Sequence, residues 1–379
     1  MTNEENTMPQ VDLENFEIPE QVESAVEDQS GGALKFAFIG SGQCGSRIAE
    51  AFYKLGYTKN IVINTSAQDL HSIEVPTKLL FAPSTGKSGA GKDMKVAAET
   101  IAMHQSDIYN YMTEILGDTA DHVFICAGLG GGTGGGSMHT LINLSRKYMQ
   151  YIGHTNPDKK VGVIVTLPTI GEASSPIVRD NALEIAEQLS TLAENGAISP
   201  MIVIDNNRIQ QLYKKTLTVD MFYPVINTTI AQLLHVFNYI TGQHTEYSSC
   251  DPTDLQSVLE AGGHMILGVT AIKDLVEQTT IADALRLNLT KTLLADGFDL
   301  TSATAAAAII VGGDKAFSTI QGLPDQINYG FDTIASLTGN AKVHRGVYKD
   351  GRKGRALSAY TMIGGLLRPG QRYARMRSS

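Results

Sequence analysis

A run of glycines between two apolar segments restricts the fold of this chain more than any other feature. Seven of the nine residues in 128–136 are glycine, and only Leu129 and Thr133 interrupt them. The run follows the apolar stretch His122–Cys126 and enters a segment with apolar residues at helical spacing. Residues without a Cβ let backbone N–H groups approach phosphate oxygens, and a helix N-terminus adds partial positive charge. The pattern predicts a phosphate-binding loop between a strand and a helix.

Two other glycine loops compete for a nucleotide. Residues 40–45 (Gly-Ser-Gly-Gln-Cys-Gly) fit the dinucleotide fingerprint between a strand and a helix. A nicotinamide site also wants an acid after the second strand, where this chain has Asn64-Thr65-Ser66. Residues 86–93 approach the Walker A pattern, but Asp93 stands where a hydroxyl should meet magnesium. Residues 40–45 and 86–93 are therefore weaker candidates for the main phosphate-binding loop than residues 128–136.

Composition narrows the class of protein. The chain has 379 residues, 42% of them hydrophobic, so it has enough apolar residues for a large core and, by default, two domains. We see no apolar stretch of membrane-spanning length and no signal peptide, and the three cysteines have no CxxC spacing. These observations favour a cytoplasmic protein without a disulfide framework or a structural zinc site.

Charge is distributed unevenly along the chain. Residues 1–32 hold nine acids and no Lys or Arg, whereas residues 342–377 hold ten Lys or Arg and one Asp. We expect an acidic disordered arm over 1–33 and a flexible basic tail over 368–379. Such a tail would fit an acidic partner, namely a DNA-bound adaptor, a viral particle, a membrane-linked protein or the acidic arm of a second copy.

Strand and helix signals alternate through most of the chain. Apolar runs of strand length occur at 35–39, 61–63, 122–126, 161–165 and 201–204, with helical patterns between them. This alternation predicts an α/β fold with a mainly parallel sheet covered by helices. A long apolar helix over 220–244 should lie buried before a second α/β domain with strands near 265–269, 306–311, 342–348 and 356–362. We divide the chain into an arm, a nucleotide-binding domain, a central helix with the loop after it, a C-terminal domain and a tail, at 1–33, 34–218, 219–254, 255–367 and 368–379.

Several segments resemble the tubulin/FtsZ superfamily in the same order along the chain. Gly130–Ser137 looks like its glycine-rich signature, Gly42–Gly45 like the first nucleotide loop of tubulin, and Asn64–Gln68 like the second loop of FtsZ. The resemblance continues through Gly89-Ala90-Gly91, Thr166-Leu167-Pro168, Asp205–Arg208, Asn227 and Asp251–Leu255, and spans roughly residues 35–367. The combination is similar to divergent phage and plasmid members of the PhuZ and TubZ kind, or to archaeal relatives.

The resemblance implies a GTPase that polymerises head to tail and hydrolyses GTP to GDP, with Mg²⁺, at the contact between subunits. It implies that Asp251 and Asp254 act on the nucleotide of the neighbouring subunit, as groups that orient or deprotonate water. It also implies that Gln43 lies near magnesium, through water. The nucleotide ligands that it implies are Gly42, Gln43, Cys44, Asn64, Gly89, Ala90, Gly91, Gly130, Gly131, Gly132, Thr133, Gly134, Gly135, Glu172, Arg179, Asn206 and Asn227.

The chain departs from the family pattern at several of these positions. Ser66 and Ser249 replace an acid and an asparagine, which predicts slower hydrolysis, and Pro176 stands where the family has the arginine that Arg179 would replace. Asp251 and Asp254 could instead only cap the next helix, and Asn227 could be a polar residue satisfied at a helix start. We interpret Cys44 and Cys250 as packing residues. A nucleotide-binding adaptor with little hydrolysis and a dehydrogenase using 40–45 remain as alternatives.

Overall fold

The computed structural model describes residues 30–84, 86, 88–213, 219–273, 275, 277–290, 294–352 and 354–378. Most of the predicted acidic arm, residues 1–29, lies outside the described residues. Within the described part, none of the helices combines the length and apolar content that a bilayer span requires.

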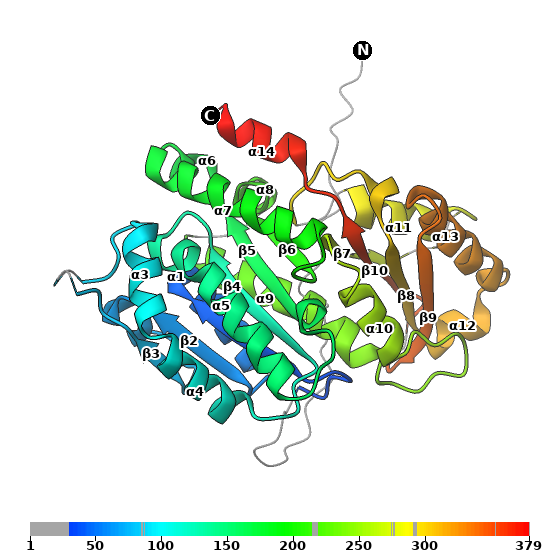
Figure 1. The fold of residues 1–379 in the computed structure, drawn as a ribbon. Coiled ribbons are helices and arrows are strands. Elements are labelled where there is room, and N and C mark those ends of the chain that lie inside the picture. Colours follow the sequence, from blue (N-terminus) through cyan, green and yellow to red (C-terminus); the bar gives the residue numbers. More distant parts are fainter. Residues whose placement is uncertain are drawn as a thin grey trace.

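The described strands form one ten-stranded sheet (Figure 1). Its order is β3-β2-β1-β4-β5-β6-β7-β10-β8-β9, parallel from β3 to β7 and from β8 to β9, with β10 antiparallel to both of its neighbours. The strands are β1 (Phe36–Ser41), β2 (Asn60–Asn64), β3 (Lys78–Leu80), β4 (His122–Gly128), β5 (Val161–Leu167), β6 (Met201–Asp205), β7 (His264–Ile272), β8 (Ala305–Gly313), β9 (Lys342–Asp350) and β10 (Leu357–Leu366).

Helices cover both faces of this sheet. Short 3-10 turns lie at Pro157–Lys160 and Leu300–Ser302. The helices are α1 (Gly42–Lys54), α2 (Ala67–His71), α3 (Met94–Met103), α4 (Gln105–Leu116), α5 (Gly132–Tyr151), α6 (Ile170–Ala173), α7 (Pro176–Glu194), α8 (Asn206–Tyr213), α9 (Val219–Ile240), α10 (Pro252–Leu259), α11 (Thr280–Thr290), α12 (Asp314–Thr319), α13 (Leu323–Leu337) and α14 (Gly370–Arg377).

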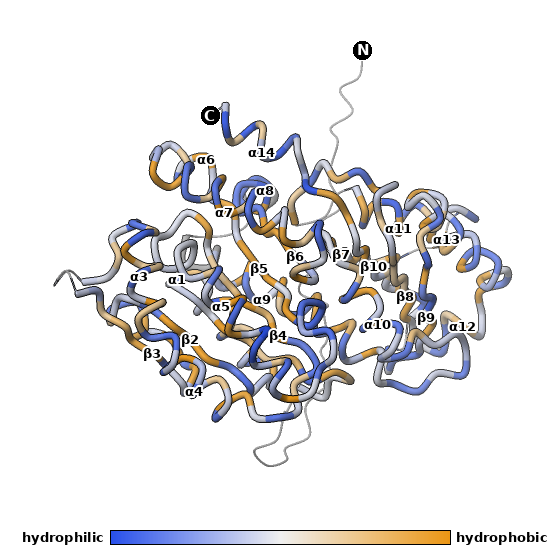
Figure 2. The backbone as a smooth tube through the Cα atoms, in the orientation of Figure 1, coloured by the Kyte–Doolittle hydropathy of each residue, from blue (hydrophilic) through white to orange (hydrophobic). Residues whose placement is uncertain are grey.

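Alternate residues of the parallel strands point into two different apolar layers. In β1, Phe36 and Phe38 join the layer that contains α1 and α9, while Ala37 and Ile39 join the layer that contains α4, α5 and α7. Because both faces are buried, these strands consist mainly of apolar residues, and β5 is largely orange in Figure 2. The predicted α/β architecture, with a mainly parallel sheet covered by helices, is confirmed.

The predicted central helix is α9. Its side chains at Ile226, Ile230, Leu233, Leu234 and Phe237 are buried, and it packs between α1 on one side and β7 and α10 on the other. It therefore lies between the two predicted domains. Parallel pairing of Met201 with His264 and of Ile202 with Met265 carries the sheet across this boundary, so the two halves share one sheet.

The prediction of a flexible tail is wrong for the described residues 368–378. Residues 370–377 form α14, and Pro369 and Gly370 stand at its start. Arg372 donates to Asp205 through Nε–Oδ2 at 2.5 Å and Nη2–Oδ1 at 2.9 Å, and both side chains are buried. Tyr373 and Met376 are buried in the layer shared with α7. Apolar burial and a bidentate ion pair thus fix the tail to β6 and α7.

Candidate nucleotide site and catalytic loop

The loops predicted to bind nucleotide follow neighbouring parallel strands. The strand order β2-β1-β4-β5-β6 places the carboxyl ends of these five strands along one edge of the sheet. The loops that leave them contain Gly42–Cys44, Asn64–Ser66, the glycine run, residues 168–172 and Asn206. In open α/β sheets this edge is where ligands bind.

Thr65 joins its own loop to the glycine run and to the second glycine loop. Its Oγ1 lies 2.7 Å from Oγ1 of Thr133 in the glycine run and accepts from the backbone N–H of Ala90 at 3.1 Å. Asn64 orders the same turn, because its Oδ1 accepts from the N–H groups of Thr65 and Ser66 at 2.8 and 3.2 Å. Sequence reasoning listed Asn64 and missed Thr65 as the residue that contacts the other loops.

Two helices begin at these loops, α1 at Gly42 and α5 in the glycine run, and no side chain caps the N–H groups of their first turns. The helix α1 starts at Gly42 and α5 starts at Gly132, and neither N-cap residue, Ser41 or Gly131, supplies a side-chain cap. Uncapped N–H groups and the positive end of a helix dipole suit phosphate oxygens. Gln43, in the first turn of α1, is exposed.

Most glycines of the run are required by tight packing within the protein. A Cβ on Gly134 would lie 2.6 Å from the carbonyl oxygen of Gly128, and one on Gly136 would lie 2.3 Å from that of Met94 on α3. By contrast, a Cβ on Gly131 would meet nothing closer than 3.7 Å. The glycine run therefore has two functions, close packing of α5 on α3 and an open backbone at Gly131.

The second glycine loop is not a Walker A loop. Asp93 is the N-cap of α3, and its Oδ1 accepts from the N–H groups of Lys95 and Val96 at 2.9 and 3.1 Å. A carboxylate in this role holds a helix start, and the part that Gly89, Ala90 and Gly91 of the same loop play toward phosphate stays a prediction.

The predicted base and ribose residues lie on α6, α8 and α9. Glu172 forms a capping box with Thr169, and its Oε1 accepts from the Tyr223 hydroxyl on α9 at 3.2 Å. Asn206 begins α8, and both it and Asn227 are buried. Asn227 lies inside α9 rather than at its start, so the helix-start interpretation of this residue is wrong. Residues of the predicted nucleotide edge therefore contact α9 near its N-terminal end.

Arg179 does not contact Glu172 in the structure. Its Nε lies 3.2 Å from Oδ1 of Asp180, its neighbour on α7. Its role toward a nucleotide stays a prediction.

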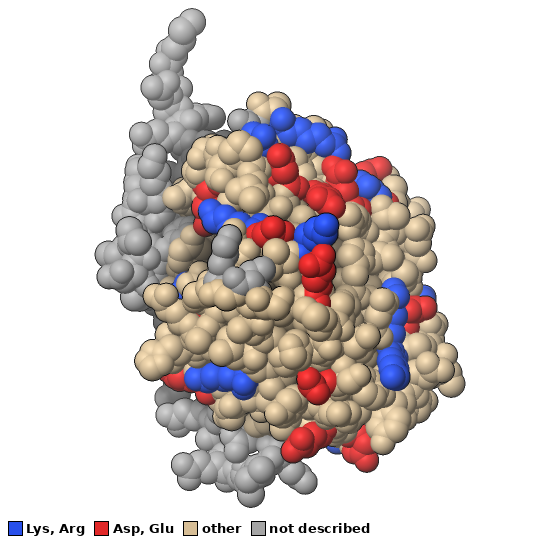
Figure 3. All heavy atoms as spheres, turned by 60° about the vertical axis from the view of Figure 1, so that its left-hand side comes forward, with Lys and Arg blue, Asp and Glu red and all other residues tan. Residues whose placement is uncertain are grey.

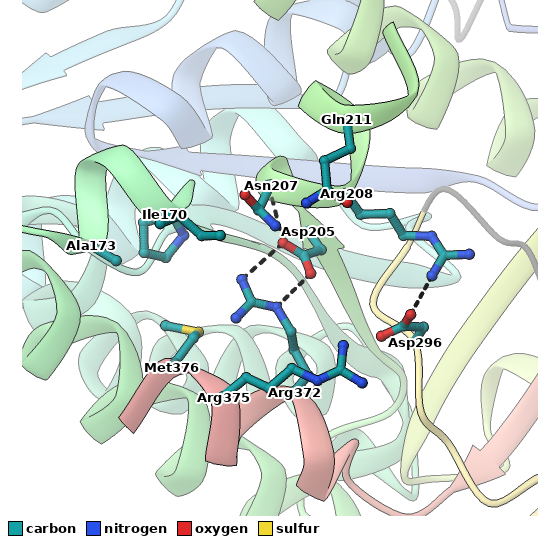
Figure 4. Close-up of a pocket in the computed structure, with 11 residues that line it drawn as sticks. Ile170, Ala173, Asp205, Asn207, Arg208, Gln211, Asp296, Arg372, Arg375 and Met376 are labelled. Carbon is teal, nitrogen blue, oxygen red and sulfur yellow. Dashed lines mark hydrogen bonds and ion pairs between the residues drawn. The ribbon is translucent and has the colours of Figure 1, made fainter. Parts of the chain in front are cut away.

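A cavity of about 420 Å³ lies between α6, α8 and α14, beside the predicted base and ribose residues (Figure 4). Figure 4 shows Arg372 pointing toward Asp205, and Arg208 toward Asp296, with an Nη1–Oδ2 distance of 2.5 Å for the latter pair. The residues that line this cavity are Pro168, Ile170, Ala173, Asp205, Asn207, Arg208, Gln211, Asp296, Arg372, Arg375 and Met376. The two acids of this cavity thus pair with arginines of the same subunit.

Both candidate catalytic acids cap α10. Asp251 is the N-cap and accepts from the N–H of Asp254 at 2.9 Å, while Oδ2 of Asp254 accepts from the N–H of Asp251 at 3.2 Å. The capping role that the sequence left open is therefore present. Each carboxylate keeps further lone pairs for another ligand.

The described cysteines are not activated nucleophiles. Burial raises the pKa of the Cys44 thiol, which lies 3.3 Å from Thr166 Oγ1, and burial also raises the pKa of Cys250 to about 12. Thiols in such surroundings stay protonated near neutral pH.

The part of the chain that carries these loops matches a known protein family. Residues 35–214 match the family model described as Tubulin/FtsZ family, GTPase domain. These residues form a tubulin/FtsZ-family GTPase domain. The domain covers every candidate nucleotide loop described above.

The chain resembles known proteins well beyond this domain. It is 27% identical over 341 residues to Cell division protein FtsZ 2 of Haloferax volcanii, covering 87% of this chain and 77% of that protein. The fold matches a GTPγS-bound protofilament of CetZ2 from Haloferax volcanii with a TM-score of 0.72 at 20% identity, covering 91% and 98% of the two chains. It also matches a GTPγS-form protofilament of TubZ from Bacillus thuringiensis with a TM-score of 0.76 at 17% identity, covering 92% and 91%.

Proposed function

We propose that this protein binds GTP, polymerises head to tail and hydrolyses GTP at the contact between subunits. There the loop before α10, which contains Asp251 and is here called the catalytic loop, would meet the nucleotide loops of the next subunit. One observation carries the proposal. The nucleotide loops adjoin the N-terminal end of α9 at Tyr223, whereas Asp251 follows its C-terminal end at Ile240. A helix rises about 1.5 Å per residue, so these two ends are roughly 25 Å apart. Asp251 comes after the far end of α9, so we infer that a second subunit brings it to the nucleotide loops.

The residues present fit the chemistry of this proposal. Gly131, Thr133 and the start of α5 would hold phosphates, and Asn206, Asn227 and Glu172 would bind the base and ribose. Magnesium would supply charge neutralisation on the phosphates, and the exposed amide of Gln43 is a suitable partner for its water. Asp251, exposed at the tip of α10, would orient the attacking water on the neighbouring nucleotide.

The partner that we propose for each subunit is a second copy of this chain. The printed descriptions of two matched structures name protofilaments of those proteins. Partners reached through a free basic tail gain no support, because Arg368, Arg372 and Arg377 pair with acids of the same subunit. The face shown in Figure 3 likewise intersperses basic and acidic side chains.

The test is GTP turnover measured against protein concentration, with Asp251→Asn beside the parent. Asparagine caps helices as well as aspartate but lacks the carboxylate, so the variant keeps the start of α10. We expect turnover per molecule to rise with concentration in the parent. In Asp251→Asn we expect it to fall by on the order of 10² to 10⁴ while filaments still form.

Three outcomes would contradict the proposal. Turnover per molecule that does not depend on concentration would exclude a shared site, and no turnover at any concentration would favour the adaptor. Parental turnover in Asp251→Asn would remove Asp251 from the chemistry.

A further inference from the structure

The catalytic loop pairs with the edge of the sheet. Strand β9 ends the strand order, and the loop before α10 occupies its outer edge. The N–H of Val347 donates to the carbonyl of Ser248 at 2.8 Å, and the Ser248 hydroxyl donates to the carbonyl of Arg345 at 2.9 Å. The Thr245 hydroxyl also donates to the carbonyl of Val347 at 2.5 Å. Edge groups that would otherwise be unpaired thus fix the course of the loop.

Two side chains of β9 then reach the loop and α10 from the same face of the strand. Tyr348 holds Cys250 at both backbone groups, because its hydroxyl accepts from the Cys250 N–H at 3.0 Å and donates to the Cys250 carbonyl at 2.7 Å. Four residues earlier, and so on the same face, lies His344. Between them, a Cβ on Gly346 would come within 3.1 Å of the Cys250 Cβ, so this face closely follows the loop.

His344 contacts the second candidate acid directly. Its Nδ1 lies 2.5 Å from Oδ1 of Asp254, and the side chains are 4% and 28% exposed. The other oxygen of Asp254 accepts from the Asp251 N–H. Asp254 is therefore held on both oxygens, whereas the carboxylate of Asp251 accepts one backbone N–H of α10.

Packing alone does not account for this histidine. Its Nε2 is buried and has no hydrogen-bond partner among the described residues. Leaving a buried polar atom unpaired costs about 1–3 kcal/mol, and an apolar side chain of similar size would avoid that cost. The Nδ1 contact with Asp254 is the interaction that this position supplies in return.

We propose that His344 is a positioning residue for hydrolysis, which donates from Nδ1–H to Asp254 and fixes the direction of that carboxylate at the subunit contact. The inference rests on the proposed function, because it concerns the same catalytic loop. Without His344, Asp254 would keep only its link to the backbone of Asp251 and would rotate away from a neighbouring nucleotide. A misplacement of about 1 Å at a reacting group is enough to cost on the order of 100-fold in rate.

The test compares His344→Asn with His344→Leu. The Nδ2 of asparagine is bonded to Cγ, as Nδ1 of histidine is, so it can donate from nearly the same place. Leucine fills the site without a donor. We expect Leu to lower kcat per assembled subunit by on the order of 10- to 100-fold, with GTP affinity and filament mass unchanged. We expect Asn to restore most of the rate.

Equal rates in the Leu and Asn variants, whether both parental or both low, would overturn the proposal, as would a loss of GTP affinity in place of kcat.

A second readout does not depend on hydrolysis. In ¹⁵N-histidine spectra of the nucleotide-free protein, we expect a hydrogen-bonded Nδ1–H signal for His344 that disappears in Asp254→Ala. Absence of the signal from the parent, or its persistence in Asp254→Ala, would overturn the proposal, even if His344→Leu does not fold. If the signal behaves as expected while Asp251→Asn turns over at the parental rate, the proposed function fails and the His344 contact stands.

Discussion

The glycines of the 128–136 run differ in the room that a side chain would have. Gly134 closely faces the backbone of Gly128, whereas Gly131 faces open space just before the first turn of α5. Phosphate binding needs open backbone, while packing needs an absent Cβ. Substitutions at the two positions should therefore separate the two functions.

We predict that Gly131→Ala weakens GTP binding at least tenfold without lowering the free energy of unfolding, because the added methyl would occupy the approach to the N–H groups of α5. Gly134→Ala should instead cost about 1–3 kcal/mol of stability through overpacking. Calorimetric GTP titration and urea unfolding measure both effects. Parental GTP affinity in Gly131→Ala would remove this position from the nucleotide site.

Buried histidines should make the fold sensitive to acid. Burial lowers the pKa of His264 to about 4, with Nδ1 near the carbonyl of Leu366 and Nε2 near the Ser190 hydroxyl. The unfolded pKa is about 6.5, so between pH 4 and 6.5 the unfolded chain binds more protons than the folded one. Stability contributed by neutral His264 is thus present above pH 6.5 and is lost as the pH falls.

At pH 5 this loss is about 2 kcal/mol for His264. Glutamine does not titrate, so His264→Gln should lose correspondingly less stability between pH 7 and pH 5 than the parent. Urea unfolding at the two pH values measures this, with His139→Gln on the exposed face of α5 as the matched control. The same pH dependence in both variants would contradict the assignment.

Among the secondary-structure elements, α14 differs most from its prediction, because a helix stands where a flexible tail was expected. Its ion pair with Asp205 lies at the end of β6, directly before Asn206 of the predicted base site. Burial raises the pKa of Tyr373 on the same helix to about 12, and its hydroxyl lies 3.1 Å from that of Ser190 on α7. The helix therefore connects the C-terminal residues to the end of β6, next to the predicted base site.

We predict that Arg372→Ala lowers the free energy of unfolding by about 3–5 kcal/mol, because it leaves the Asp205 carboxylate buried and unpaired. Arg375→Ala, on the exposed side of the same helix, should change stability by less than about 0.5 kcal/mol. Chemical unfolding measures both variants, and limited proteolysis after Arg368 reports release of α14. Equal stability of the two variants would show that the ion pair does not hold the helix.

Short-range patterns carried most of what could be predicted. The strands, the glycine run and α9 follow from apolar periodicity and glycine chemistry within each segment. The docking of α14 depends on Arg372 meeting Asp205, 167 residues away, and the His344 contact joins residues 90 positions apart. Local composition suggested a flexible tail because four arginines without acids look solvated when their distant partners are unknown. Thr65 was missed for the same reason, since its contacts come from two other loops.

At the scale of the whole molecule, the two halves of the proposed active site lie at opposite ends of α9. The nucleotide loops and Tyr223 adjoin one end, and the catalytic loop, held by β9, follows the other. Figure 1 shows α10 on the side away from α6 and α8. Because the two surfaces differ, their contact is heterologous and repeats from subunit to subunit, as a filament requires.

A mixture of two variants with different defects should therefore hydrolyse GTP faster than either variant alone. Gly131→Ala has a defective nucleotide site and an intact catalytic loop, and Asp251→Asn has the reverse. When the two mix at equal amounts, random heterologous pairing joins a good nucleotide site to a good loop at about a quarter of the contacts. We expect turnover near a quarter of the parental rate, well above either variant alone. Adding Gly131→Ala to the double variant Gly131→Ala/Asp251→Asn is the matched control, because no contact in that mixture has an intact nucleotide site. If the first mixture remained as inactive as this control while electron microscopy showed both variants in the same filaments, the site would be complete within one subunit and the catalytic loop would have another role.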